Sequence, residues 1–492
     1  MTQSITAPYR ETPPSSYRHP WRTSAILGLL LLLSLGCASV LARIAHPGDT
    51  KDGLFLGLWL VSFLPYLAAC LLIVRTGPAV GKWRWVEWGC LIAGALLLRV
   101  IFIPIDPNLS RDSWRYVWDA RITLHGYSPL ATTPNNPIFV QWQDVIYQNS
   151  RYRNVPSLYP PTAQGIYVLS YLLFPSNLYG LKGIFMLFDL GSCVLLALLL
   201  RRQGLDPRRV IFYAWCPLPI VEFAMQGHVD VTTITFMLLV FWFDPIQKPW
   251  GRILTGFFIA MATMTKFYPL LLLIVVWRPR DWALLASCFG SIVLGYIPFL
   301  VLGHGQVVGF FSHYASEQGG NAGPIQLTSY LLGLLFLRRN MPWILSLQTL
   351  INLAVVSAAV VIVCIQRMRG KISKEGACLV LIVSVFACSS HVFPWYVAAL
   401  VPWLPFGIGS LWAQRSDQQK RPLHTRSIAY ACGWYFACIS VIGYFCVTPN
   451  QWYAYDLVTY GVVCIGLGFI LWYERESIAE TVKNWSSLRD KR

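Results

Sequence analysis

The chain has 492 residues, of which 55% are hydrophobic and only 12% are charged. So little charge, together with apolar runs of roughly 15–23 residues, is typical of an all-α polytopic membrane protein. The net charge of +17 does not indicate nucleic-acid binding, because 27 of the 39 Lys and Arg residues lie in the two ends and in alternate loops. This is the positive-inside pattern, and it predicts that both ends are cytoplasmic.

The chain divides into one membrane domain with a short tail at each end. Residues 1–23 and 474–492 are predicted cytoplasmic tails, and residues 24–473 form a single transmembrane domain. The apolar pattern predicts a helical bundle of about 12–14 spans. Our placement of the spans is 24–43, 53–74, 85–104, 179–200, 209–225, 229–244, 252–267, 268–277, 282–302, 342–365, 376–391, 395–412, 427–447 and 457–473. The segment 268–277 is too short to cross alone, so it is predicted to be a broken or re-entrant helix.

A polar segment lies between the third and fourth predicted spans. Residues 105–178 form an outward loop by the positive-inside rule. Within it, Asp106–Pro161 holds four Asp, five Arg, nine aromatic residues and seven Pro. Such a segment is too aromatic for a disordered linker and too polar to cross a bilayer. It is what we expect of an enzyme that works at the boundary between lipid and water.

A short helix is predicted over 111–124 of this loop. Ser110 is a favourable N-cap residue, and Gly126 stands where a glycine commonly ends a helix. This helix and a second one over 162–174, which follows Pro160 and Pro161, are expected to lie on the outer membrane surface.

One face of the first helix carries its chemistry. Asp112, Tyr116 and Asp119 are spaced i, i+4, i+7 and share a face, and Arg115 is placed to pair with either carboxylate. Asp112 is in the first turn, where the helix dipole, Arg111 and Arg115 favour its ionised form. The alternative is an ordinary surface helix stabilised by ion pairs.

Ionisable residues also occur inside the apolar runs, where they are costly. They are Arg99, Asp189, Glu222, Asp230 and Lys266. Each has two interpretations, namely an interhelical bond that holds the bundle together or a part of a site. Lys266 is the best candidate for binding a phosphate, because it precedes Pro269 at a predicted helix break.

Six blocks in order carry a family resemblance: Asp112-x-x-x-Tyr116-x-x-Asp119-Ala-Arg121, Gly126-Tyr-Ser-Pro129, Tyr159-Pro-Pro-x-Ala-Gln164, Cys216-Pro-Leu-Pro-Ile-Val-Glu222 with Gly227-His228-Val-Asp230, Lys266-Phe-Tyr-Pro269, and His391-Val-Phe-Pro-Trp395-Tyr396. They span roughly residues 85–410 and resemble the integral-membrane glycosyltransferases of the GT-C superfamily. The likeness is closest to bacterial polyprenyl-phosphate-mannose-dependent mannosyltransferases. Two departures are Ala120, where the family more often has Gly, and two additional spans before the acidic loop.

The resemblance implies transfer of a sugar from a polyprenyl phosphate to an acceptor hydroxyl, with inversion, at the outer membrane face. Mannose is the family's usual sugar. The implied roles are catalytic for Asp112, Asp119 and His391, donor-phosphate binding for Arg111, Arg115, Arg121 and Lys266, and substrate binding for Tyr116, Tyr159, Gln164, His228, Asp230, Trp395 and Tyr396. Asp112 is the candidate general base. No cofactor is expected, and no metal, because His228 and Asp230 lack evident third and fourth ligands.

The expected partners are the polyprenyl-phosphate-linked sugar donor, membrane lipid, and an acceptor that is a glycolipid, a polysaccharide or a protein, with no nucleic acid. The expected location is the inner (plasma) membrane. Three other classes of protein stay open, one of which is a non-catalytic accessory membrane protein that would leave the six ordered blocks unexplained. A transporter or flippase also uses many helices and intramembrane charge, although we find no internal repeat. An O-antigen ligase or polymerase uses similar lipid donors.

Overall fold

The computed structural model describes residues 20–44, 52–311, 314, 321–325, 327–328, 342–407, 423–446, 448, 450–466, 468–469 and 472. In these residues the regular structure is helical, without a strand. Five helices are long and apolar enough to cross a membrane, and a sixth span is formed if one bent pair is counted. The predicted class, an all-α polytopic membrane protein, is confirmed.

The helices and their bounds are α1 (Pro20–Ile44), α2 (Asp52–Arg75), α3 (Lys82–Val100), α4 (Asp112–Leu124), η1 (Pro137–Trp142), α5 (Val145–Asn149), α6 (Pro161–Leu173), α7 (Leu178–Arg202), η2 (Pro207–Val210), α8 (Ile211–Ala214), α9 (Pro217–Pro219), η3 (Ile220–Met225), α10 (Asp230–Phe243), α11 (Pro249–Thr263), η4 (Tyr268–Leu271), α12 (Leu272–Val276), α13 (Trp282–Leu302), α16 (Pro342–Met368), α17 (Lys374–Ala387), α18 (Pro394–Ala398), η5 (Val401–Trp403), α19 (Leu404–Gly407), α20 (Leu423–Ile439) and η6 (Ser440–Phe445). Residues 450–466 are also helical.

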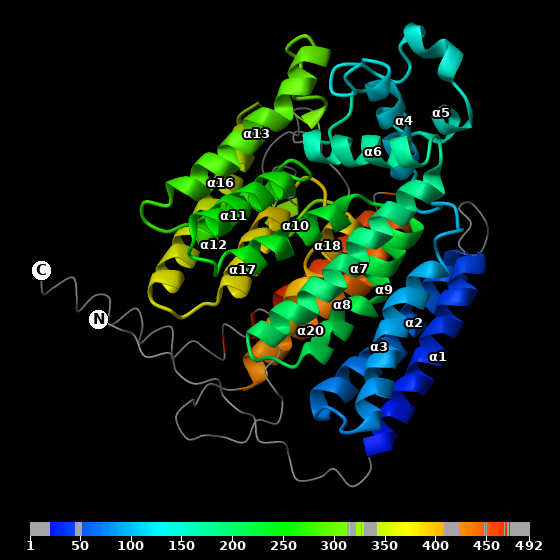
Figure 1. The fold of residues 1–492 in the computed structure, drawn as a ribbon, viewed down its shortest axis with the longest axis vertical. Helices are drawn as coiled ribbons and strands as arrows, with labels where there is room; N and C mark the ends of the chain where they lie inside the picture. The colour runs from blue at the N-terminus through cyan, green and yellow to red at the C-terminus, as the bar shows by residue number, and fades with distance from the viewer. Residues whose placement is uncertain are drawn as a thin grey trace, which may run out of the picture.

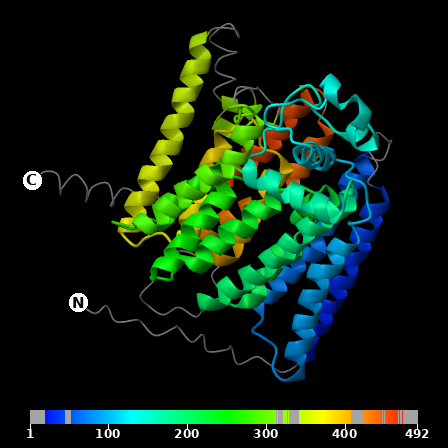
Figure 2. The ribbon, with the colours of Figure 1, turned by 45° about the horizontal axis from the view of Figure 1, so that its top comes forward.

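The long helices form a bundle with two clear edges. Helix α1 packs on both α2 and α3 at one edge, and α16 stands at the other, where it contacts α12 and α17 (Figures 1 and 2). The five long apolar helices α1, α2, α7, α13 and α16 match predicted spans. The predicted span at 85–104 corresponds to α3, which is helical but is not one of the five helices that are long and apolar enough to cross a membrane.

Two predicted spans are a bent pair in the structure. The helical path bends by 120° between Pro217–Met225 and Asp230–Phe243. The break follows η3, which is a π-helix, and Gly227 at the bend has a φ of +70°. Glycine adopts this left-handed backbone without the steric cost of a side chain. The segment 268–277, predicted to be a broken or re-entrant helix, contains two short consecutive helices, η4 and α12.

The polar loop folds into the short helices α4, α5 and α6, which gather at one end of the bundle (Figure 1). Helix α6 is joined end to end with α11, because the backbone N–H groups of Thr162 and Ala163 donate to the carbonyl of Met264 (3.0 and 3.3 Å). Helix α4 packs on α6 and α7. The loop is therefore packed directly against the membrane helices.

Buried charges tie α3 to α7. Arg99 donates to both carboxylate oxygens of Asp189 (2.7 and 3.2 Å), and both side chains are fully buried. Lys182 of α7 donates to three carbonyls at the end of α3, those of Phe102, Ile103 and Ile105. For Arg99 and Asp189 the structure supports the interpretation as an interhelical bond, because each charge has its partner on the neighbouring helix.

Both predicted tails lie outside the described residues, except for the start of α1 at Pro20. The predicted spans at 395–412, 427–447 and 457–473 are described only in part.

Candidate functional site

Helix α4 presents Asp112 at its first turn. The helix was expected over 111–124 and is found over Asp112–Leu124, ending before Gly126, whose φ is +87°. The predicted N-cap is wrong by one residue, since Arg111 is the N-cap, although the Ser110 hydroxyl accepts from the backbone N–H of Asp112 (3.4 Å). The Asp112 carboxylate is half-buried and has no hydrogen bond or ion pair within the part of the chain that the structure describes.

Asp119 is in the opposite situation, because it is fully buried and paired. Arg115 donates to Asp119 (2.7 Å), and its other two nitrogens donate to the carbonyls of Tyr152 (2.7 Å) and Val155 (3.1 Å). Gln164 adds a long bond from Nε2 to Asp119 (3.4 Å). Of the two carboxylates that Arg115 was able to reach, it binds Asp119. This network fixes the shape of the loop, and it leaves Asp112 as the accessible carboxylate.

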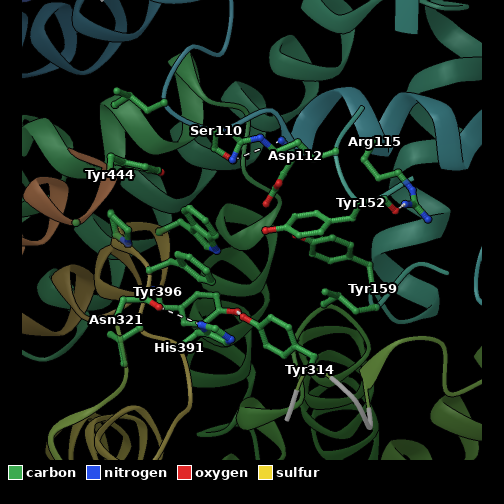
Figure 3. A pocket seen from close by; sticks show the side chains of 18 of the residues that line it. Ser110, Asp112, Arg115, Tyr152, Tyr159, Tyr314, Asn321, His391, Tyr396 and Tyr444 are labelled. Carbon is green, nitrogen blue, oxygen red and sulfur yellow. Dashed lines mark hydrogen bonds between the residues drawn. The ribbon is translucent and has the colours of Figure 1, made fainter. Parts of the chain in front are cut away.

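A cavity of about 290 Å³ opens beside Asp112, close to the lower limit of about 300 Å³ that is usual for small-molecule sites. Figure 3 shows Asp112 on one side of it and His391, Asn321 and Tyr396 on the other. The wall comes from four parts of the chain that are distant in sequence. It includes Ser110, Asp112, Tyr116, Arg151, Tyr152, Tyr159, Tyr314, Asn321, His391, Trp395, Tyr396, Tyr444, Trp452 and Tyr455.

Two phenols line the cavity next to Asp112. The hydroxyl of Tyr116 donates to that of Tyr159 (2.8 Å). Burial raises the pKa of Tyr159 well above its ordinary value, and the nearby charges of Asp112 and Asp230 raise it further. Burial raises the pKa of Tyr116 in the same way. Both phenols therefore stay protonated at neutral pH and act as hydrogen-bond donors.

Lys266 lies behind the Tyr159 ring, just after the end of α11. Its ammonium is 5.0 Å from the centre of the Tyr159 ring and 4.8 Å from that of Tyr396, and both of these residues line the cavity. It also lies 3.4 Å from the buried carboxylate of Asp230. Contacts with two aromatic faces and one carboxylate hold the positive charge at the edge of the cavity.

His391 stands on the far wall. Its Nδ1 donates to the Asn321 side chain (3.0 Å), and the backbone N–H of the next residue, Val392, donates to the Asn321 carbonyl (2.7 Å). The ring of His391 is stacked on Phe393, which is stacked on Trp395 (centroids 5.4 and 4.3 Å apart). The indole N–H of Trp395 is buried and has no hydrogen-bond partner among the described residues.

His228 continues that stack behind Trp395, with ring centres 4.0 Å apart. Its Nδ1 donates to the buried carboxylate of Glu222 (2.9 Å), which also accepts from the hydroxyl of Tyr444 (2.8 Å). Trp395 and Tyr444 line the cavity, whereas His228, Glu222 and Asp230 lie beneath its wall. No group of three or more His, Cys, Asp or Glu side chains in the described residues is arranged to hold a metal ion.

The structure thus brings together most of the predicted site residues and leaves some apart. Asp112, Tyr116, Tyr159, His391, Trp395 and Tyr396 face one cavity, and Lys266, His228 and Asp230 lie directly behind its wall. Arg121 is directed elsewhere, to Asp144 (2.8 Å) and the Trp142 carbonyl, and Arg111 is exposed outside the wall. Arg115 lines the cavity, but its three guanidinium nitrogens donate to Asp119, Tyr152 and Val155.

Several wall residues were not predicted from the sequence. Arg151, Tyr152, Tyr314, Asn321 and Tyr444 line the cavity. The sequence around Tyr152 gave no recognisable pattern. In the structure its φ is +54°, which is unusual for a residue other than glycine. The others come from segments to which we had assigned no motif.

The sequence model of glycosyltransferase family 87 matches residues 158–394 of the chain. That range begins just before Tyr159 and ends at Pro394, so it includes Tyr159, Lys266 and His391 but neither Asp112 nor Tyr396. A search of curated proteins found no match. The family match and the apolar helices together support a membrane glycosyltransferase.

Proposed function

From this likeness to glycosyltransferase family 87, we propose that the protein transfers a sugar, most simply mannose, from a polyprenyl-phosphate donor to an acceptor hydroxyl with inversion at the anomeric carbon. The observation that carries the proposal is the cavity, where the accessible carboxylate of Asp112 faces a wall of hydrogen-bond donors with the ammonium of Lys266 close behind it.

In the proposed reaction the acceptor oxygen attacks the anomeric carbon as its proton passes to the Asp112 carboxylate. The bond between that carbon and the phosphate oxygen breaks, and both bonding electrons leave with the polyprenyl phosphate. Asp112 is suited to the role of general base because its carboxylate borders the cavity and, among the described residues, has no hydrogen bond or ion pair. Asp119 is assigned the structural role, as the partner of Arg115.

The departing phosphate gains negative charge, so it requires cations and donors near the bond that breaks. We assign this task to Lys266, with the phenol of Tyr159 and the indole of Trp395 as neutral donors. His391 is assigned to the acceptor side or to the phosphate. Arg115 and Arg121 receive no direct role, because their guanidinium groups are committed to protein carbonyls and carboxylates.

The positive-inside pattern supports an active site on the outer side, with both ends of the chain in the cytoplasm of a bacterial-type plasma membrane. The cavity is too small for a polyprenyl chain, so we place only the sugar and phosphate inside it and the lipid tail in the bilayer. The acceptor is a glycolipid, a polysaccharide or a protein, and no metal or cofactor is required in this scheme.

The test uses purified full-length protein in lipid nanodiscs with polyprenyl-phosphate mannose as donor and an alkyl mannoside as a glycolipid mimic. Parallel reactions contain glucose, galactose and arabinose donors. We expect product formation, and we expect Asp112→Asn to lower kcat by at least about 100-fold, in line with the loss of a general base. The variant should remain folded and inserted.

Near-normal turnover by Asp112→Asn would remove Asp112 from the proposed role. The same assay separates the other classes of protein. A flippase would move the lipid-linked sugar across the bilayer without forming a glycoside. A ligase or polymerase would require an oligosaccharide on a lipid diphosphate and would not use the monosaccharide phosphate.

A further inference from the structure

The bend between η3 and α10 lies against the beginning of α4. Residues 226–229 form this bend, and none of their side chains has been given a role in the chemistry so far except His228 as a predicted substrate contact. Gln226 is fully buried at the start of the bend. It comes from a segment more than 100 residues away from α4, and its contacts are therefore set by the tertiary fold.

The side-chain carbonyl of Gln226 binds the chain that leads into α4. It accepts hydrogen bonds from the backbone N–H groups of Leu109 and Ser110, each at 3.0 Å. These two N–H groups lie just before the helix, where a backbone donor without an acceptor would be costly to bury. One oxygen atom therefore fixes the backbone two and three residues ahead of Asp112.

Two further contacts position the residues on either side of Asp112. The hydroxyl of Ser110 accepts from the N–H of Asp112. On the other side of Asp112, a Cβ atom placed on Gly227 would lie 3.2 Å from the Cβ of Ser113 and 3.2 Å from the Cγ of Lys182, which is tighter than an ordinary contact, and the φ of +70° at this position also favours glycine. The first turn of α4 is held from both sides by the bend.

The bend is itself rigidly held. The backbone N–H of His228 donates to the Glu222 carbonyl (3.0 Å), and its side chain donates to the Glu222 carboxylate (2.9 Å). At its far end, Asp230 faces the ammonium of Lys266 (3.4 Å). One short segment thus contacts the backbone that carries the candidate base and the cation that we assign to the leaving phosphate.

We propose that Gln226 is a positioning residue for this reaction, which fixes the place of the Asp112 carboxylate by binding the backbone of Leu109 and Ser110. The inference rests on the proposed role of Asp112 as the base. It goes further by assigning a catalytic consequence to a buried amide that does not border the cavity. Displacing a reacting group by about 1 Å costs on the order of 100-fold in rate, so a loosened anchor should affect turnover more than binding.

The test compares two substitutions of similar size. Gln226→Met removes the accepting oxygen, whereas Gln226→Glu keeps an oxygen that can accept from both N–H groups. We expect Gln226→Met to lower kcat by about 10- to 100-fold with the KM values of donor and acceptor changed by less than about threefold. We expect Gln226→Glu to recover most of that loss. Gln203→Met is the matched control, since Gln203 binds Glu375 away from the cavity.

A second variant protects the test against misfolding of Gln226→Met. Gly227→Ala removes no side-chain hydrogen bond, but it strains a bend whose φ is +70° and presses a methyl group against Ser113 and Lys182, and it should also lower kcat with little change in KM. Thermal unfolding is measured for each protein in the same nanodiscs, and kinetics are compared only among variants that remain folded. The donor is polyprenyl-phosphate mannose and the acceptor an alkyl mannoside.

The inference is overturned if folded Gln226→Met keeps its kcat within about twofold, or if Gln226→Glu loses as much activity as Gln226→Met does. Asp112→Asn is assayed in parallel, so the two proposals fail separately. An active Asp112→Asn variant contradicts the role of Asp112 as the base. An inactive Asp112→Asn variant beside a fully active Gln226→Met variant contradicts only the role of Gln226.

Discussion

The ion pair between Arg99 and Asp189 allows a quantitative test of what holds the bundle together. The guanidinium makes two bonds to the carboxylate and one each to the carbonyls of Ala95 and Ala214, and the hydroxyl of Tyr213 adds a bond of 2.6 Å to Asp189. Both charged side chains are fully buried. Removal of either partner leaves a buried charge without its counterion, which costs about 3–5 kcal/mol.

We therefore expect Arg99→Met and Asp189→Leu each to lower the free energy of unfolding by about 3–5 kcal/mol. The double variant removes both charges and leaves only uncharged groups without these partners, namely the hydroxyl of Tyr213 and the carbonyls of Ala95 and Ala214, which costs less than a buried charge without its counterion. It should accordingly be more stable than either single variant. The measurement is unfolding in mixed detergent micelles, followed by tryptophan fluorescence.

Additive losses in the double variant would refute this reasoning, because they would mean that the two side chains stabilise the bundle independently. A loss below about 1 kcal/mol in either single variant would also contradict it, since that is the range of an exposed pair.

Two further predictions concern the polar loop and the donor site. Lys266→Met should raise the KM for the donor by about 10-fold or more, because a hydrogen bond to a charged group contributes about 1.5–3 kcal/mol. The control is Lys248→Met at the other end of α11, which should leave this KM unchanged. Equal KM values in the two variants would exclude Lys266 from phosphate binding. At Asp144, burial tends to raise the pKa, but hydrogen bonding and charge from Arg121 outweigh it and lower the pKa below its ordinary value. The ionised carboxylate of Asp144 therefore stabilises the fold fully above its pKa in the unfolded chain, and this stabilisation is lost as the pH falls through its lower pKa in the folded protein. Asp144→Asn should accordingly reduce the difference in unfolding temperature between pH 6 and pH 3. An unchanged difference would contradict this assignment.

Local features of the sequence were sufficient to predict α4. Ser110 and Gly126 predicted a helix over 111–124, and the structure places it at Asp112–Leu124, with its start displaced by one residue. The choice of Arg115 between two carboxylates was not predictable, because both lie within reach on the same helix. It is decided by the carbonyls of Tyr152 and Val155, which reach Arg115 only when the loop folds back.

The far wall of the cavity shows where prediction from sequence reaches its limit. The block from His391 to Tyr396 was recognised as a possible part of the site, but its partners Asn321, Tyr314 and Tyr444 were not. They contribute single side chains from segments with no pattern of their own. Their proximity follows from how the helices pack, as does the contact between Gln226 and the backbone before α4.

The end-to-end junction of α11 and α6 has an electrostatic consequence. The N-terminus of a free helix attracts anions through its unpaired N–H groups and its dipole. In α6 two of these groups are satisfied by the carbonyl of Met264, and the partial charges of the two helix ends cancel. The positive end of α6 therefore offers little attraction to a phosphate, so the phosphate binding that we propose depends on the full charge of a side chain such as Lys266.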